Sequence, residues 1–317
     1  MPKILIGSTN YSVYCREGLA LLESAGYTVV ENTHGRPLTP EELAAAAADA
    51  VGVIAGVEQW DEAAFAAAPE LKVIVRFGTG YDTVDLEAAK RRGVQVANTP
   101  GLNADSVAEH VAAFILCMLR KLVPLNASTR AGGWDRVVYR ELSTCTVGMI
   151  GFGAIGRKLA HKLSGFSPRL IAYDIFPNEE AGKQLGVEFV SFEELLAQSD
   201  FITIHLPLTK DNFHMMDAAA FAKMKKGACL INAARGPLVD EKAAADALAE
   251  GTLGAFAADV HETEPMTKDD PLVRFPNYIA TPHLAGESET SYRNTGIATA
   301  TGVLNVLQGR PLDHRLV

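Results

Sequence analysis

The chain has 317 residues, of which 48% are hydrophobic and 21% charged, and its formal net charge is −9. This length predicts about two domains, and the composition excludes a disordered chain. The negative charge is spread along the sequence without a Lys/Arg-rich block, which disfavours nucleic acid and anionic membrane as partners.

Signals for export and for membrane insertion are weak. The N-terminal sequence MPKILIGSTN has too short an apolar stretch for a signal peptide. The longest apolar run, Val111–Leu119, has nine residues and is too short to span a membrane. The four cysteines are far apart and form no CxxC pair, which predicts free thiols in a reducing compartment. We therefore expect a cytoplasmic protein.

The first part of the chain alternates short apolar runs with helical patterns, which is typical of β-α-β units and a parallel sheet. Strands are expected at Lys3–Ile6, Gly52–Ala55, Lys72–Arg76 and Val94–Val96. Helices are expected at Cys15–Ala25, Pro40–Asp49 and Asp61–Ala68. These elements predict a small doubly wound domain that ends near residue 100.

A longer helix is expected after Asn103, a candidate N-cap, and Pro124 is expected to stop it. We interpret this helix as the connection between two domains. Further strands are expected at Val147–Ile150, Arg169–Tyr173, Phe189–Val190, Phe201–His205, Ala228–Asn232, Gly254–Asp259 and Tyr278–Thr281. They predict a second, larger doubly wound sheet. A last helix at Ser288–Leu307, stopped by Pro311, is expected to return to the first domain.

A glycine-rich loop, Gly151-Phe-Gly-Ala-Ile-Gly156, follows the apolar run Thr146–Ile150. Alone, this GxGxxG pattern is also compatible with a tight turn that binds nothing. Here it lies between a predicted strand and a predicted helix, and Asp174 ends the next strand 18 positions after Gly156. Such glycines let backbone amides approach a pyrophosphate at a helix N-terminus, and the carboxylate accepts hydrogen bonds from the ribose hydroxyls. Because a carboxylate repels a 2′-phosphate, the motif predicts NAD rather than NADP.

Three further segments place a polar side chain shortly after a predicted strand, namely Arg235 after Asn232, Glu264 after Asp259 and His283 after Thr281. Each residue alone has an ordinary structural explanation, such as a surface ion pair, a solvated carboxylate or a buried structural histidine. Together they fit an open parallel sheet, which binds ligands at the carboxyl ends of its strands. Histidine can give or accept a proton near neutral pH, a neighbouring carboxylate stabilises the imidazolium, and arginine suits a substrate carboxylate.

In combination, these motifs resemble the D-isomer-specific 2-hydroxyacid dehydrogenase family, and within it the 3-phosphoglycerate dehydrogenase-like branch. The resemblance covers nearly the whole chain and is carried by Arg76–Asp85, Asn98–Glu109, the glycine loop, His205–Thr209 and the three strand-end segments. It implies an α/β fold with two doubly wound (Rossmann/flavodoxin-like) parallel-sheet domains and an interdomain cleft. Residues 1–100 with 287–317 would bind substrate, and residues 101–286 would bind NAD. The resemblance further implies a hinge near residues 100 and 286 and a homodimer.

The implied activity is hydride transfer between NAD(H) and C2 of a small (R)-2-hydroxy or 2-oxo acid. By this resemblance Arg235 binds the substrate carboxylate, and His283, paired with Glu264, is the general acid/base. The predicted NAD contacts are Thr79, Gly151, Gly153, Ala154, Ile155, Gly156, Asp174, Leu206, Pro207, Ala233, Arg235, Asp259, His283 and Ala285. The predicted substrate contacts are Gly78, Thr79, Gly80, Arg136, Arg235 and His283. Asp259 also has a purely structural interpretation, and His205 is assigned a supporting role.

The identity of the acid stays open. Ala55–Gln59 stands where many phosphoglycerate dehydrogenases have an arginine, so 3-phosphoglycerate, hydroxypyruvate, glyoxylate, lactate-type and bulkier acids are all compatible. Serine feedback through a C-terminal regulatory domain is not expected in a chain that ends at Val317. The eight histidines show no metal-ligand spacing with a suitable third ligand, so no catalytic metal is predicted.

Related folds offer alternatives to this interpretation. Formate dehydrogenase pairs its histidine with glutamine, which Glu264 disfavours, and S-adenosylhomocysteine hydrolase has a much longer chain. Co-repressors that resemble C-terminal binding proteins keep the fold, bind NAD(H) and retain the Arg/Glu/His set while acting through partners. An NAD(H)-sensing binding protein of this kind is therefore the alternative function.

Overall fold

The computed structural model describes all residues, 1–317, and they form two compact units. The first unit combines Met1–Asn103 with Glu287–Val317, and the second is the continuous stretch Ala104–Gly286. The chain leaves the first unit three residues beyond the position expected from the sequence, and it returns at the expected residue.

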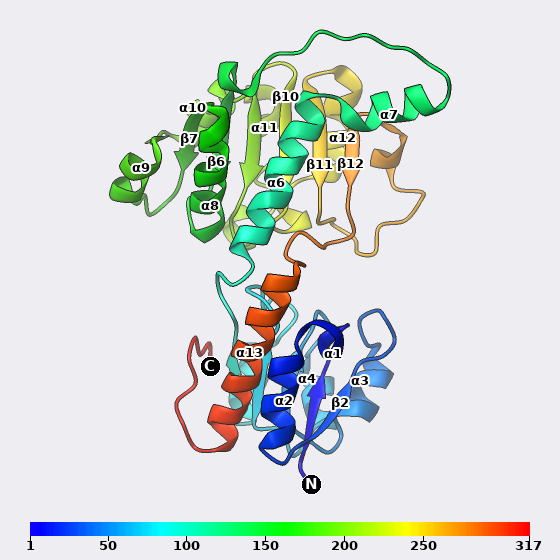
Figure 1. Ribbon diagram of the computed structural model, residues 1–317, viewed down its shortest axis with the longest axis vertical. Helices are drawn as coiled ribbons and strands as arrows, with labels where there is room; N and C mark the ends of the chain where they lie inside the picture. Colours follow the sequence, from blue (N-terminus) through cyan, green and yellow to red (C-terminus); the bar gives the residue numbers. More distant parts are fainter. The chain divides into compact units, whose positions relative to one another are not determined.

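The first unit contains a five-stranded parallel sheet (Figure 1). Its order β2-β1-β3-β4-β5 is the flavodoxin-like arrangement. The strands are β1 (Lys3–Ile6), β2 (Thr28–Glu31), β3 (Ala50–Ala55), β4 (Val73–Arg76) and β5 (Gln95–Ala97). The helices are α1 (Tyr11–Tyr14), α2 (Arg16–Ser24), α3 (Pro40–Ala47), α4 (Glu62–Ala67), α5 (Leu86–Arg91) and α13 (Glu289–Leu307).

Both faces of this sheet are buried, as a parallel sheet requires. On one face, Ile4 and Ile6 pack in a cluster with Leu22 of α2 and Val303 of α13. On the other, Leu5 packs with residues of α3 and α4. Alternate residues of β1 therefore enter opposite halves of the core, which explains why its sequence is apolar throughout.

The second unit contains a seven-stranded parallel sheet of order β12-β11-β10-β9-β6-β7-β8. The order reverses between β6 and β9, as in dinucleotide-binding folds. The strands are β6 (Thr146–Ile150), β7 (Arg169–Tyr173), β8 (Val187–Phe189), β9 (Phe201–Ile204), β10 (Ala228–Asn232), β11 (Leu253–Ala258) and β12 (Tyr278–Ala280). The helices are α6 (Ala104–Leu119), α7 (Leu122–Arg130), α8 (Ala154–Leu163), α9 (Glu179–Leu185), α10 (Phe192–Gln198), α11 (Ala218–Lys223) and α12 (Glu241–Glu250).

Helices also cover both faces of the second sheet. Ile115 of α6 and Leu159 of α8 pack with Met149 on one face. Leu195 of α10 packs with Ile150 on the other face, in the cluster that also holds residues of α11 and α12. Several helices begin at an aspartate that accepts a hydrogen bond from the N–H three residues on, including Asp240 before α12. Such a cap contributes about 1 kcal/mol to stability.

The predicted fold class, two doubly wound parallel sheets, is confirmed. The sequence interpretation missed α1, β2 and α5, which are short or, like β2, half-exposed edge elements. It also placed β8 two residues too late, at Phe189–Val190. The predicted connecting helix, α6, lies wholly within the second unit.

The interpretation of Pro124 as a helix stop was wrong, because Pro124 is the third residue of α7. In the first turn of a helix a proline gives up no intrahelical hydrogen bond. The α7 helix and the segment after it extend from the second unit (Figure 1). The segment after α7 exposes apolar side chains, including Trp134 and Val138. No single helix is long and apolar enough to cross a membrane, and α6 and α7 meet that test only as a pair bent by 58°.

Candidate active site

Arg235, Glu264 and His283 come after three neighbouring strands of the second sheet. Arg235 follows β10, Glu264 follows β11 and His283 follows β12. These strands are parallel and adjacent, in the order β12-β11-β10. Their carboxyl ends therefore share one edge of the sheet, which is the edge where open α/β sheets bind ligands.

Glu264 and His283 form a direct pair. The Oε2 atom of Glu264 lies 2.8 Å from Nδ1 of His283, and both side chains remain partly exposed, at 37% and 41%. Burial raises the pKa of the Glu264 carboxyl, but the hydrogen bond and charge of His283 outweigh it and keep that pKa below its ordinary value. Glu264 is therefore ionised at neutral pH. Its other oxygen accepts the backbone N–H of His261 at 3.0 Å.

The backbone at His283 has an unusual conformation that Asp259 supports. His283 has a φ of 53°, in the left-handed region, and its N–H donates to the Asp259 carbonyl at 2.8 Å. The buried Asp259 carboxylate accepts the N–H groups of Leu284, at 3.0 Å, and Ala285, at 2.8 Å. These contacts give Asp259 a structural part in holding the loop that carries His283.

His110 of α6 joins the same network and was not singled out in the sequence. Its Nε2 lies 3.1 Å from the hydroxyl of Thr281, which itself donates to Asp259 at 2.5 Å. The hydroxyl has only one proton, so it accepts the hydrogen bond from His110. A lone histidine in a helix carries no pattern that would reveal this contact.

Arg235 lies in the turn after β10 with its side chain half-buried. Its Nη1 donates to the Ala234 carbonyl at 2.6 Å, and its own carbonyl accepts the Asn232 side-chain amide at 2.8 Å. The next residue, Gly236, packs directly on the loop after β11, since an added Cβ would overlap the carbonyl oxygen of His261. The loops that carry Arg235 and Glu264 are thus in close contact.

The glycine loop between β6 and α8 lies at the point where the strand order reverses. Gly151 has a φ of 95°, and a Cβ there would come within 2.8 Å of the His205 carbonyl. A Cβ at Gly156 would lie 2.7 Å from the Gly151 carbonyl, so glycine permits this close packing of helix and strand. Gly153, by contrast, has no atom within 4 Å of its Cβ position and caps α8 without a side chain. Open space beside uncapped N–H groups fits a dinucleotide pyrophosphate.

Asp174 directly follows β7, next to this loop. Its carboxylate accepts the N–H of Phe152 at 2.8 Å and that of Phe176 at 2.9 Å. The carboxylate therefore faces the glycine loop, where it can accept hydrogen bonds from the ribose of a nucleotide bound there. Ala154 and Ile155 form the first turn of α8 on the other side of the loop.

His205 follows β9 at the same sheet edge, and the supporting role predicted for it stays a prediction. Burial lowers the pKa of its imidazole to about 3, so the ring is neutral at physiological pH. Its Nε2 lies 3.2 Å from the Thr203 hydroxyl. Leu206 and Pro207 continue the chain at the same sheet edge, while Ala233 and Ala285 lie in the turns after β10 and β12.

The remaining predicted contacts belong to other segments of the chain. Gly78, Thr79 and Gly80 follow β4 in the first unit, where Gly78 has a φ of 133° and its N–H donates to Thr99 Oγ1 at 3.0 Å. Arg136 is exposed in the segment after α7. The structure gives no contact between Arg136 and the pair, so its role in substrate binding stays a prediction.

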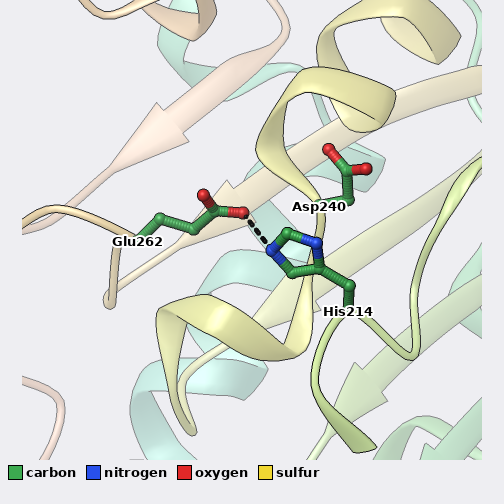
Figure 2. A group of neighbouring side chains, drawn as sticks. All are labelled: His214, Asp240 and Glu262. Carbon is green, nitrogen blue, oxygen red and sulfur yellow. Dashed lines mark ion pairs between the residues drawn. The ribbon is translucent and has the colours of Figure 1, made fainter.

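One group of possible metal ligands emerges only in three dimensions. Atoms of His214, Asp240 and Glu262 lie within 4.8 Å of one another. Figure 2 shows the imidazole between the two carboxylates, with Nε2 paired to Glu262 at 2.8 Å. Asp240 also caps α12 through the Ala243 N–H, and Glu262 accepts the Glu241 N–H at 3.1 Å. Protein groups already engage all three side chains, and the absence of a catalytic metal stays a prediction.

The fold and the strand-end residues together define a two-unit α/β protein whose second unit has a dinucleotide-binding site. Residues 112–285 match the model of the D-isomer specific 2-hydroxyacid dehydrogenase NAD-binding domain. The chain therefore belongs to the D-isomer specific 2-hydroxyacid dehydrogenase family, which confirms both the resemblance and the choice of NAD.

Individual relatives agree with this assignment. The chain is 39% identical to D-3-phosphoglycerate dehydrogenase of Archaeoglobus fulgidus over 78% of its own length and 47% of that protein. It is 35% identical to glyoxylate reductase of Thermofilum pendens over 92% of the chain and 88% of the relative. D-lactate dehydrogenase from Aquifex aeolicus, solved with NAD and lactic acid, superposes with a TM-score of 0.83 at 27% identity, covering 97% and 96% of the two chains. The chain thus spans about half the length of the first relative.

Proposed function

We propose that the chain is an NAD-dependent dehydrogenase that moves a hydride between nicotinamide and C2 of a small (R)-2-hydroxy or 2-oxo acid. The observation that carries the proposal is the 2.8 Å contact between Glu264 and His283, at the sheet edge that also holds the dinucleotide loop. The named relatives are dehydrogenases and reductases, which supports this class of reaction and gives no support to the co-repressor alternative.

His283 has the proton-transfer role in this proposal. Bound NAD(H) supplies or accepts the hydride. Reduction of a 2-oxo acid places negative charge on the carbonyl oxygen, so a proton must reach that oxygen. Because ionised Glu264 can only accept a hydrogen bond, Nδ1–H of His283 donates to it and Nε2 is left for the substrate. The imidazolium Nε2–H protonates the oxygen during reduction, and the neutral Nε2 takes that proton back during oxidation.

Arg235 has the substrate-binding role. Its planar guanidinium suits a carboxylate through two parallel hydrogen bonds. It follows β10, next to the strands that lead to Glu264 and His283. Binding of the carboxylate would hold C2 in one orientation toward the hydride and the acid/base, which lowers the entropic cost of the reaction.

Glu58 bears on which acid is used. It lies in the segment where phosphoglycerate dehydrogenases often have an arginine, and it is 2% exposed. Its Oε1 accepts the Gly56 N–H at 3.0 Å and lies 3.3 Å from Nε1 of Trp60. This segment therefore places the carboxyl group of Glu58 in the protein interior, and it has no positively charged side chain that could bind a substrate phosphate. We infer that acids without a phosphate, such as glyoxylate or pyruvate, are the better substrates.

A panel of 2-oxo acids tests the proposal. With NADH, we expect measurable reduction of glyoxylate, hydroxypyruvate or pyruvate, and a lower kcat/KM for 3-phosphohydroxypyruvate. A higher kcat/KM for the phosphorylated acid would overturn the inference from Glu58 only. NADH binding without turnover of any acid in the panel would contradict the enzyme and favour the NAD-sensing protein.

Substitution of Asp174 tests the cofactor site. Asp174→Ala should weaken NADH binding by about ten-fold or more, since hydrogen bonds to a charged group contribute about 1.5–3 kcal/mol. The difference in affinity between NADH and NADPH should become smaller, because the repulsion of a 2′-phosphate disappears. Dissociation constants from NADH fluorescence measure both effects. Asp246→Ala, an exposed position on α12, is the matched control. A wild-type preference for NADPH would show that the argument from Asp174 is wrong.

A further inference from the structure

One residue, His261, contacts each of the three loops that carry Arg235, Glu264 and His283. It lies in the loop after β11 and is 6% exposed. The three proposed functional residues come from separate strand ends, so their mutual placement depends on how these loops are joined. Because His261 contacts all three loops, it can fix how they are placed relative to one another.

The backbone of His261 joins two of the loops. Its N–H donates to Oε1 of Glu264 at 3.0 Å, which leaves Oε2 for His283. Its carbonyl packs against Gly236, the neighbour of Arg235, where any side chain would collide with it. Every residue type except proline offers the same N–H, so these contacts do not require histidine at this position.

The imidazole of His261 reaches the third loop. Its Nε2 lies 3.2 Å from the carbonyl oxygen of Thr281, two residues before His283. A carbonyl only accepts hydrogen bonds, so Nε2 carries the proton. Nδ1 lies 3.2 Å from the hydroxyl of Tyr278 at the start of β12. Burial raises the pKa of Tyr278 above its ordinary value, so this hydroxyl keeps its proton and donates to Nδ1.

The charged groups around this ring come from two elements. Oε1 of Glu241, the first residue of α12, lies 4.0 Å from Nδ1 of His261 and accepts the Glu262 N–H at 3.0 Å. Burial raises the pKa of Glu241, so its negative charge is disfavoured at this site. Glu264 engages the backbone N–H rather than the ring. The Thr281 carbonyl and the Tyr278 hydroxyl together thus fix the orientation of the His261 ring, with Nε2 as donor and Nδ1 as acceptor.

We propose that His261 is a positioning residue that sets the geometry of the Glu264–His283 pair through the hydrogen bond from its imidazole to the Thr281 carbonyl. The backbone of residue 261 holds the carboxylate, and its ring holds the strand end that leads to the imidazole of His283. The consequence for catalysis rests on the function proposed above. The structural claim, that loss of the ring loosens the pair, is independent of any substrate.

His261→Phe is the first test, because phenylalanine keeps the backbone contacts and the ring volume but removes both ring hydrogen bonds. We expect kcat for 2-oxo acid reduction to fall by about ten-fold, as small misplacements of catalytic groups do, with KM for NADH unchanged. His261→Gln restores an N–H donor toward Thr281 and should recover most of the lost rate. Wild-type kcat in His261→Phe, or equal losses in both variants, would overturn the proposal.

A second measurement does not depend on activity. In the cofactor-free full-length protein, imidazole NMR signals report the pH midpoint at which His283 is protonated. A loosened contact with Glu264 stabilises the imidazolium of His283 less, so His261→Phe should move this midpoint to lower pH. Tyr278→Phe keeps the hydrogen bond from His261 to Thr281, so it should move the midpoint less. An unchanged midpoint in folded His261→Phe would overturn the proposal. If His261→Phe does not fold, the midpoints of His261→Gln and His261→Ala are compared instead. His261→Gln should stay near wild type, and His261→Ala should move to lower pH. If the wild type reduces no 2-oxo acid, the proposed function fails while this measurement still tests the positioning role.

Discussion

Replacement of His283 by alanine is expected to lower kcat for 2-oxo acid reduction by about 10²–10⁴-fold, the usual contribution of general acid–base catalysis. The reason is that the imidazole paired with Glu264 is the proton donor in the proposed reaction, and alanine offers no proton in its place. Affinity for NADH should stay within a few-fold of wild type, since the glycine loop and Asp174 are separate elements. Stopped-flow or steady-state rates with a 2-oxo acid, together with NADH fluorescence titration, measure the two quantities.

The backbone conformation at His283 calls for a second variant. A φ of 53° strains most residues, so alanine could also disturb the loop. Asparagine tolerates this conformation, so His283→Asn should keep the wild-type melting temperature. Because its amide does not serve as a general acid/base, His283→Asn should lose as much activity as His283→Ala. His161→Ala, at an exposed position in the last turn of α8, is the matched histidine control. Turnover within a few-fold of wild type in His283→Asn would rule out the acid/base role.

Replacement of Glu264 by glutamine is expected to lower kcat by roughly 10²-fold or more, by analogy with other carboxylate–histidine pairs. Both carboxylate oxygens accept hydrogen bonds, one from His261 N–H and the other from His283 Nδ1. A side-chain amide has a single acceptor oxygen, so its NH₂ group must face one of these two atoms. If it faces Nδ1, the neutral ring carries its proton on Nε2, which is the wrong tautomer for a base.

The pH dependence of Glu264→Gln has a definite sign. Since His283 holds the pKa of Glu264 below its ordinary value, the carboxylate is charged at every pH at which a histidine titrates. Without that charge the imidazolium is less stable. Reduction needs the imidazolium, so the rate of 2-oxo acid reduction falls as the pH rises. This fall should begin at a lower pH in the variant than in the wild type. Glu250→Gln, exposed at the end of α12, should keep the wild-type profile. An unshifted decline would contradict the electrostatic role of Glu264.

The parts of this molecule that were predictable share a common cause. Buried strands such as β6 and β10 are apolar throughout because both of their faces are covered. The glycines of the loop and Asp174 follow a spacing that the dinucleotide itself imposes. The shared location of Arg235, Glu264 and His283 followed from strand order, since parallel strands bring their carboxyl ends to one edge.

The parts that were not predictable depend on loop conformation. The contacts of His261 and His110 with the Thr281 segment arise from residues without periodic pattern or motif spacing. The half-exposed edge strand β2 lacks the buried apolar run that marks the central strands. The catalytic and binding roles of individual residues, the interdomain cleft and hinge, the homodimer and the cytoplasmic location stay predictions.

The two-segment construction of the first unit has a consequence for biosynthesis. Residues of α13, such as Val303 and Leu304, complete the apolar cluster over one face of β1 and β4, yet they leave the ribosome after the whole stretch Ala104–Gly286. Nascent chains fold domain by domain as they emerge. The N-terminal sheet must therefore wait, with one apolar face only partly covered by α2, until the nucleotide-binding unit has been translated. The domain that begins the polypeptide is the last to mature.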